Sequence, residues 1–367
     1  MTADTGNAQP PRLELPEFYI EGGPDSGQGA YTGFNSLNLQ EVYVVEKWPV
    51  ERSQIARGWG KPIIARLSNG DLLATQYQKR PAAGEEAALC RSKDEGLTWS
   101  SPRLLGLPPG RPGQFTALQD GTLILATNRL YRSSDEGETW TPCKVDWRGS
   151  DGGPEDHDFG ETGGAIELED GTLICGFFVS QGAPPPKGYV LRSHDGGRTW
   201  GDPSFAAAGA SETSLIVLPG GKLLGFARYR TGRAGEGGAC LGMIESTDQG
   251  RTWSPIRPLL GMAQIPGFPV LLPDGRLVLV YGHRQFPFGA QAIASRDQGA
   301  TWDMTRPIIL AWFSWDSYCG HPRSILMPDG SVMTGYYARV FRGENQNDDI
   351  VAHALRWRPP EGWPAGA

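Results

Sequence analysis

The feature that most constrains the fold of this chain is an eight-residue motif, S-x-D-x-G-x-T-W, which occurs five times. Its copies occupy residues 92–99, 133–140, 193–200, 246–253 and 295–302. Repeats at intervals of about fifty residues indicate a solenoid, a propeller or another array of similar units. Ser and Asp side chains bond their own backbone in tight turns, and Gly supplies a positive φ. We therefore expect each copy to be a structural turn between strands and not a catalytic element.

A second repeat is interleaved with the first. Six turns that end in glycine lie between apolar runs, and Asp-Gly or Asn-Gly in that setting is the strongest short hairpin signal. They recur every 50 to 55 residues, at 69–70, 120–121, 170–171, 220–221, 274–275 and 329–330. Each unit then contains a strand, a hairpin, a strand, a loop, a strand, the motif and a strand. This order predicts an all-β, six-bladed β-propeller with four strands in each blade.

The ends of the chain set the limits of the propeller, which is expected over residues 38–358. An extended N-terminal arm (1–37) rich in Gly, Pro, Ser and Asn precedes it, and a C-terminal tail (359–367) follows it. The sixth unit lacks the eight-residue motif, and we expect the alternating segment 41–46 to supply its outermost strand. Such closure would join the two ends of the chain and remove open sheet edges.

Composition narrows the classes of function. The net charge of −7 argues against a nucleic-acid or anionic-membrane partner. The five cysteines are odd in number and lack C-x-x-C spacing, so buried free thiols are expected and a disulfide framework is not. No signal-peptide core and no apolar run of about 18 residues is found. A cytoplasmic location is therefore expected, or a secreted or periplasmic one if a leader has been removed.

No cofactor and no metal ion is expected. The sequence has no phosphate-binding glycine loop followed by a helix and no paired metal ligands. The segment 155–161 contains four acidic residues and one histidine, and we interpret it as a solvated acidic loop.

The first strand of each propeller blade lines the central channel, and its start lies at the mouth where ligands bind. Counting back nine residues from each hairpin glycine gives Lys61, Pro112, Thr162, Glu212, Pro266 and His321. Three of these six side chains are ionisable, which favours a binding site at this end of the channel. Arginines also follow the second strands of four blades, namely Arg80, Arg228, Arg284 and Arg339. Arginines converging from several blades would form a clamp for a carboxylate.

These features together resemble the sialidase (neuraminidase) superfamily, whose members are six-bladed propellers that carry the same motif, the Asp-box or BNR repeat. The resemblance covers about residues 40–357. The best functional match is the segment 211–228. In sialidases a similar segment carries a glutamate that activates the nucleophile and an arginine that binds the substrate carboxylate. The resemblance implies these roles for Glu212 and Arg228, and a carboxylate-binding role for Arg284.

The resemblance implies further pocket residues in blade one. Lys61 lies where sialidases carry the arginine of an Arg-Ile-Pro sequence, so Lys61 or Arg57 would have to complete the carboxylate clamp. Arg80 resembles a second pocket arginine. Glu86 lies near the position of the usual aspartic acid/base.

The chain departs from the sialidase pattern in blade six, where His321 occupies the position of the tyrosine nucleophile and Tyr318 lies three residues earlier. Two routes of glycoside hydrolysis stay open. Tyr318 could attack with Glu212 as its base, which retains the anomeric configuration, or His321 and Glu212 could activate water, which inverts it.

The leading hypothesis is an exo-glycosidase that acts on a terminal sialic acid or a related acidic sugar. A polysaccharide lyase or uronic-acid-directed glycosidase is a second hypothesis, in which His321 or His157 removes a proton next to a carboxylate. The third is a non-catalytic carbohydrate- or protein-binding propeller, because fold alone does not fix function.

Overall fold

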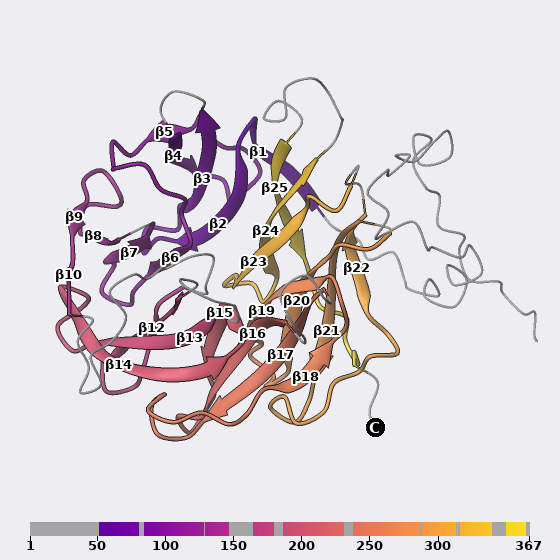
Figure 1. Ribbon diagram of the computed structural model, residues 1–367. Helices are drawn as coiled ribbons and strands as arrows, with labels where there is room; N and C mark the ends of the chain where they lie inside the picture. Colours follow the sequence, from indigo (N-terminus) through magenta and orange to yellow (C-terminus); the bar gives the residue numbers. More distant parts are fainter. Residues whose placement is uncertain are drawn as a thin grey trace, which may run out of the picture.

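The computed structural model describes residues 51–80, 84–127, 129–146, 164–179, 186–230, 238–286, 288–312, 314, 316–339 and 350–364. These residues form 25 β-strands in six sheets around a common centre (Figure 1). The prediction of an all-β, six-bladed propeller is confirmed.

The first three blades follow one another from the N-terminal side. Blade one contains β2 (Gly60–Arg66), β3 (Leu72–Arg80), β4 (Gly84–Ser92) and β5 (Arg103–Leu104). Blade two contains β6 (Gln114–Ala117), β7 (Leu123–Ala126), β8 (Leu130–Ser133) and β9 (Thr141–Pro142). Blade three contains β11 (Ile166–Glu167), β12 (Leu173–Val179), β13 (Lys187–Ser193) and β14 (Thr199–Ala208), and β10 (Lys144–Val145) adds a fifth, parallel strand to its outer edge. The fifth strand differs from the predicted four.

The remaining three blades close the ring. Blade four contains β15 (Ala210–Val217), β16 (Leu223–Arg230), β17 (Ala239–Ser246) and β18 (Arg257–Leu260). Blade five contains β19 (Gln264–Leu271), β20 (Leu277–His283), β21 (Gly289–Ser295) and β22 (Ile308–Ala311). Blade six contains β23 (Gly320–Leu326), β24 (Val332–Arg339), β25 (Ile350–Trp357) and β1 (Glu51–Arg57).

The strand that closes the ring is β1, which pairs antiparallel with β25. The prediction that residues 41–46 supply this outermost strand was wrong in its position, since residues 51–57 fill it. Residues 41–46 and the expected arm 1–37 lie outside the described residues. The prediction that a strand from the N-terminal side completes blade six is confirmed. This strand covers the outer edge of the sheet.

The six hairpin turns share one geometry. In each, the glycine N–H donates a hydrogen bond to the carbonyl oxygen three residues earlier, at 2.9 to 3.0 Å. The glycines at 70, 121, 171, 221, 275 and 330 all have positive φ. A side chain would strain this backbone, which explains why the turn always ends in glycine.

The five Asp-box turns also share one hydrogen-bond pattern. In the first copy, Ser92 Oγ accepts from the N–H of Gly96 at 2.8 Å and donates to Asp94 Oδ1 at 2.8 Å. The same carboxylate accepts from the N–H and the hydroxyl of Thr98, and the Trp99 indole N–H donates to the Gly96 carbonyl. The other four copies repeat these contacts. The motif is therefore a self-contained turn, as predicted.

We expect the Asp-box carboxylates to make the fold acid-sensitive. Hydrogen bonds from the following threonine, with the serine contributing less, hold the pKa of Asp94, Asp135 and Asp248 at about 2. An unfolded Asp has a pKa of about 3.9, so these bonds stabilise the native state above that pH and are lost as the pH falls towards 2. The melting temperature, followed by circular dichroism, should fall steadily between about pH 4 and pH 2. An Asp135→Asn variant, which cannot titrate there, should show a smaller fall, and a constant melting temperature would contradict the assignment.

The core lies between blades. Clusters of buried apolar side chains fill the six interfaces between neighbouring sheets. Three cysteines, Cys90, Cys175 and Cys319, are buried free thiols as expected, whereas Cys143 and Cys240 are partly exposed. After β25 the chain folds back towards blade five, where Trp363 is buried and its indole N–H donates to the Arg306 carbonyl at 2.8 Å. This part of the expected tail is packed against the propeller.

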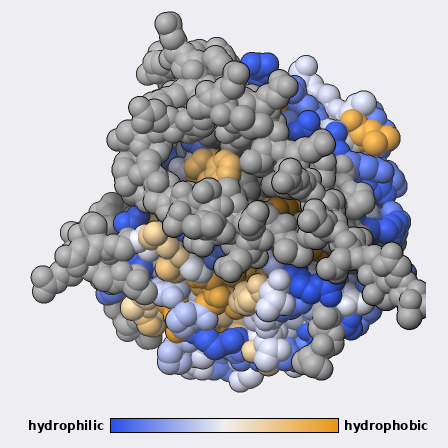
Figure 2. All heavy atoms as spheres, turned by 90° about the vertical axis from the view of Figure 1, so that its right-hand side faces the viewer, coloured by the Kyte–Doolittle hydropathy of each residue, from blue (hydrophilic) through white to orange (hydrophobic). Residues whose placement is uncertain are grey.

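The described surface carries both polar and apolar side chains. Figure 2 shows hydrophilic and hydrophobic residues interspersed on one side of the molecule. The large apolar side chains exposed among the described residues are distributed over several blades: Leu97, Leu104, Phe205, Met262, Met304 and Leu326. No helix in the described part of the chain could span a bilayer.

Candidate active site

The candidate site lies where the innermost strands begin, and β-bulges shape it. The pairing register shifts at residues 61–62 in blade one, 211–212 in blade four, 265–266 in blade five and 321–322 in blade six. Bulges redirect side chains and often lie next to active sites. Lys61 and His321 have φ angles of 53° and 44°, in the left-handed region, and each stands between a glycine and a proline. These local distortions occur at the residue that lies nine positions before the hairpin glycine, which was expected at the mouth of the channel.

Five of the predicted residues lie within electrostatic range of one another there. The charges of Glu212, Arg284 and Arg228 all act on the pKa of Lys61. Arg284 and Arg228 also act on the pKa of His321. The structure thus brings Lys61, Glu212 and His321 of the strand-start count near Arg228 and Arg284 from the ends of the second strands.

The acidic group of this cluster is Glu212, on β15. Its Oε1 forms an ion pair with Arg228 Nη1 at 2.7 Å, and the side chains are 11% and 22% exposed. Its Oε2 is buried and has no hydrogen-bond partner among the described residues. One oxygen is therefore held by an arginine, and the other can accept a proton or a hydrogen bond.

Two of the basic groups are disfavoured in their charged forms. Burial, followed by the charge of Arg111, holds the pKa of Lys61 well below its usual value. Burial, followed by Lys61 and Arg284, does the same to the pKa of His321. The His321 imidazole is therefore neutral at neutral pH and lies 6.1 Å from the Tyr337 ring. An anionic ligand would favour protonation of Lys61, since it would offset the neighbouring cations.

Arg284 follows β20 and is fixed by the chain that enters blade six. Its Nε donates to the Cys319 carbonyl at 3.1 Å. Burial lowers the pKa of Arg284, but Tyr337, Cys319 and Glu212 together raise it above the usual value. The guanidinium thus stays charged in the cluster.

Tyr318 is held by a set of contacts that the sequence did not reveal. Its hydroxyl lies 3.1 Å from the Tyr77 hydroxyl, and its N–H donates to Asp316 Oδ1 at 2.8 Å. Asp316 also pairs with Arg339, whose guanidinium lies 4.8 Å from the centre of the Tyr318 ring. Arg339 therefore orients Tyr318 and pairs with a local acid, rather than joining an open clamp.

Tyr77, Arg111 and Tyr337 are site residues that the sequence reasoning missed. Two basic side chains lie close to the Tyr77 ring, with Lys61 Nζ at 5.7 Å and Arg111 Cζ at 5.5 Å from its centre. Tyr77 pairs with Gly60 across blade one, and Tyr337 pairs with Gly320 across blade six. Both tyrosines follow their hairpin glycine by seven residues, a spacing that could have identified them.

The other predicted residues lie on outer strands of their blades or outside the described part. Arg57 is exposed at the end of β1, on the outermost strand of blade six. Glu86 is partly buried on β4, the third strand of blade one, opposite Gln78. The side chain of Arg80 and the acidic segment 155–161 lie outside the described residues. Among the residues that are described, no group of three or more His, Cys, Asp and Glu could hold a metal ion.

Comparison with known proteins agrees with this geometry at the level of the fold. Residues 126–285 match the BNR repeat-like domain family. The chain therefore has a six-bladed, sialidase-like propeller fold. No curated protein matches it in sequence.

Three solved structures illustrate the likeness. A protein of unknown function from Dyadobacter fermentans DSM 18053 is 20% identical, with a TM-score of 0.69 over 84% of this chain and 99% of that one. A Hadza microbial sialidase is 21% identical, with a TM-score of 0.58 over 81% of this chain and 65% of that one. The Penicillium chrysogenum alpha-L-arabinanase, solved with arabinobiose, is 16% identical, with a TM-score of 0.60 over 83% of this chain and 98% of that one. The chain thus spans less than two thirds of the sialidase, and identities this low show the fold alone.

Proposed function

We propose that this protein is an exo-glycosidase of the sialidase type, which hydrolyses the bond to a terminal sialic acid or a related acidic sugar. The observation that carries the proposal is Glu212, a carboxylate with one oxygen paired to Arg228 and the other buried without a hydrogen-bond partner among the described residues. It lies within a cluster of cationic side chains at the mouth of the channel.

The cluster suits a sugar that carries a carboxylate. Arginine binds carboxylates with a planar pair of N–H donors, and two arginines from different blades fix the orientation of the sugar ring. Arg228 and Arg284 would take this role, assisted by Lys61 once the anion favours its charged form. A neutral sugar would leave the repulsion among these cations uncompensated.

Hydrolysis requires a proton donor and an attacking group. In the proposed reaction Glu86 protonates the leaving oxygen as the glycosidic C–O bond breaks. The Tyr318 oxygen forms a bond to the anomeric carbon while its proton passes to Glu212, and water then releases the sugar with retained configuration. The contacts of Tyr318 favour this route: Asp316 holds its backbone N–H, Arg339 lies over its ring, and the Tyr77 hydroxyl lies 3.1 Å from its hydroxyl.

A second candidate is elimination from a uronic-acid polysaccharide. It is favoured by His321, a buried neutral imidazole beside the arginines that would hold a carboxylate. A neutral histidine can accept the proton next to that carboxylate. The products would carry a carbon–carbon double bond and absorb in the ultraviolet, which hydrolysis products do not.

A substrate panel tests the proposal. Purified protein is incubated with 4-methylumbelliferyl glycosides of N-acetylneuraminic acid, glucuronic acid and arabinose, and with uronate polysaccharides followed by ultraviolet absorbance. We expect fluorescence from an acidic glycoside and none above background from the arabinoside. Faster release from the arabinoside would contradict the acidic-sugar assignment. Binding of sugar acids without turnover would instead identify a carbohydrate-binding propeller.

A further inference from the structure

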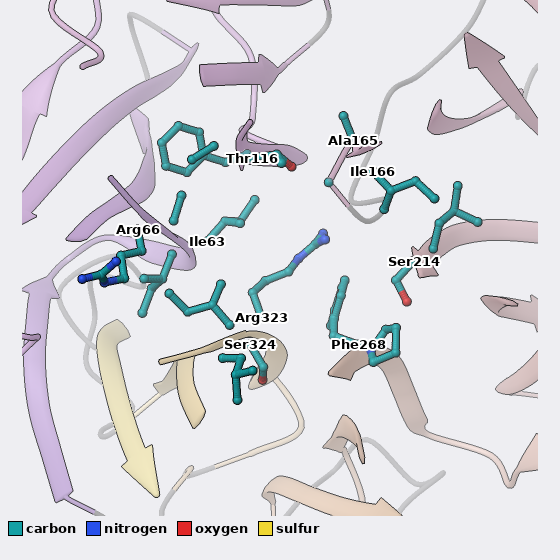
Figure 3. Close-up of a pocket in the computed structure, with 18 residues that line it drawn as sticks. Ile63, Arg66, Thr116, Ala165, Ile166, Ser214, Phe268, Arg323 and Ser324 are labelled. Carbon is teal, nitrogen blue, oxygen red and sulfur yellow. The ribbon is translucent and has the colours of Figure 1, made fainter. Parts of the chain in front are cut away.

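A groove lies on the outer side of the propeller, where blades one and two meet. It is larger than the recess along the axis, which has a volume of about 260 Å³ and into which Arg323 extends beside Phe268 (Figure 3). The groove has a volume of about 690 Å³ and lies between blade one and the Asp-box turn of blade two. This volume falls within the range of about 300–1,000 Å³ that is typical of ligand sites. We call it the blade one–two groove, and its walls include Leu73, Leu89, Trp99, Ser101, Arg103 and Glu138.

The groove combines buried apolar side chains with exposed polar ones. Leu73 of β3 and Leu89 of β4 are buried, and Trp99 is partly buried. Arg103 lies opposite Leu89 in the β4–β5 ladder, so both side chains lie on the same face of blade one. Glu138 belongs to the Asp-box of blade two, and its side chain is 60% exposed. A ligand in the groove would therefore meet apolar side chains below it and polar groups along its edges.

Ion pairs largely balance the charges inside the groove. Arg91 pairs with Asp71 and, across to blade two, with Glu136. Nη2 of Arg103 lies 3.6 Å from Oε1 of Glu138. These pairs join the two walls and leave no large excess of either charge, which favours a neutral ligand over an ionic one.

Several polar groups of the groove can still bind a ligand. Nη2 of Arg103 donates to the Gly137 carbonyl at 2.8 Å, and the guanidinium has further N–H donors in its planar fork. The carboxylate of Glu138 and the hydroxyl of Ser101 make no hydrogen bond with any described residue. Lys93, exposed at the edge, adds three more N–H donors. Donors and acceptors thus lie side by side, which suits hydroxyl groups because they both donate and accept.

We propose that the blade one–two groove binds a neutral oligosaccharide, whose hydroxyls bond to Arg103, Glu138 and Ser101 while the C–H face of a sugar ring packs on the leucines. The site is separate from the proposed active site. The strand β2 runs from Lys61, at the mouth of the channel, to the hairpin at 69–70, and Asn69 of that hairpin donates to Glu136 of the groove at 3.2 Å. The groove therefore lies towards the opposite end of the blade, and binding there does not depend on the proposed hydrolysis.

Isothermal titration calorimetry of the full chain with neutral sugars tests the proposal. The panel contains lactose, maltotriose, cellotriose and xylotriose. We expect saturable binding of at least one sugar at millimolar concentrations, unchanged when didehydro-deoxy-N-acetylneuraminic acid saturates the mouth of the channel. Absence of binding by the whole panel would overturn the proposal. Displacement of the sugar by the acidic compound would place it at the mouth and would overturn the proposal as well.

Two variants assign the binding to the groove. Glu138→Ala and Arg103→Ala should each weaken it about tenfold or more, the cost of a hydrogen bond to a charged group. Alanine fits the turn, because Ala300 holds the position of Glu138 in the Asp-box of blade five. Arg257→Ala is the matched control and should keep full affinity, since Arg257 Nη2 makes the corresponding contact from the outermost strand of blade four, to the Gly299 carbonyl at 2.7 Å. Full affinity in both groove variants, or equal weakening by Arg257→Ala, would overturn the proposal.

Discussion

Replacing Glu212 with glutamine is expected to lower kcat on the acidic glycoside by about 10²–10⁴-fold, the usual contribution of a general base. The amide keeps the shape of the side chain and can still accept a hydrogen bond from Arg228, so the fold should be unaffected. It cannot take a proton from an attacking hydroxyl or water. The measurement is the steady-state rate with the best substrate of the panel, together with a melting curve.

A matched variant separates this effect from a change in surface charge. Glu245→Gln removes a carboxylate that forms an ion pair with Lys222 at 2.7 Å on blade four, away from the strand starts. It should leave kcat and KM unchanged. If both glutamine variants keep full activity, Glu212 has no role in proton transfer and the proposed mechanism is wrong.

Replacing Tyr318 with phenylalanine is expected to have an equally large effect, at least about 10³-fold on kcat, because the attacking oxygen is removed. Tyr77→Phe removes the neighbouring hydroxyl and should cost about tenfold, the equivalent of one hydrogen bond. His321→Asn should reduce the rate less than Tyr318→Phe does, since its ring packs beside Tyr337 and does not attack in this route.

Proton NMR of the first sugar anomer released decides between the two hydrolytic routes. Attack by Tyr318 predicts release of the retained anomer. If the inverted anomer appears first and Tyr318→Phe stays active, water activated by His321 and Glu212 is the correct route. The retained anomer combined with an inactive Tyr318→Phe variant would exclude direct attack by water.

Much of the architecture was predictable because its signals are local. Each Asp-box satisfies its own polar groups within eight residues, and each hairpin glycine takes a conformation that other residues avoid. The order of these turns along the chain therefore predicted six sheets correctly. The closing strand was misplaced because the alternating pattern of residues 41–46 resembles a strand more than residues 51–57 do. Pairing with β25 depends on a distant partner, which no local pattern records.

The candidate site was predictable only in part, for the same reason. Lys61, Glu212 and His321 were found because bulges in three blades lie at the same counted position before the hairpin glycine. The Tyr77–Tyr318 contact was missed because it joins residues 241 positions apart. The sequence could not distinguish Arg339 from Arg228 and Arg284, the proposed carboxylate-binding arginines. Its ion pair with Asp316 makes that distinction.

The central claim is that side chains from four blades form one pocket for the carboxylate of an acidic sugar. The most direct measurement is a crystal structure with didehydro-deoxy-N-acetylneuraminic acid bound. We predict that its carboxylate lies about 3 Å from the guanidinium groups of both Arg228 and Arg284, with Glu212 and Tyr318 facing the anomeric carbon. A ligand bound at another surface, or with its carboxylate directed towards solvent, would contradict the account.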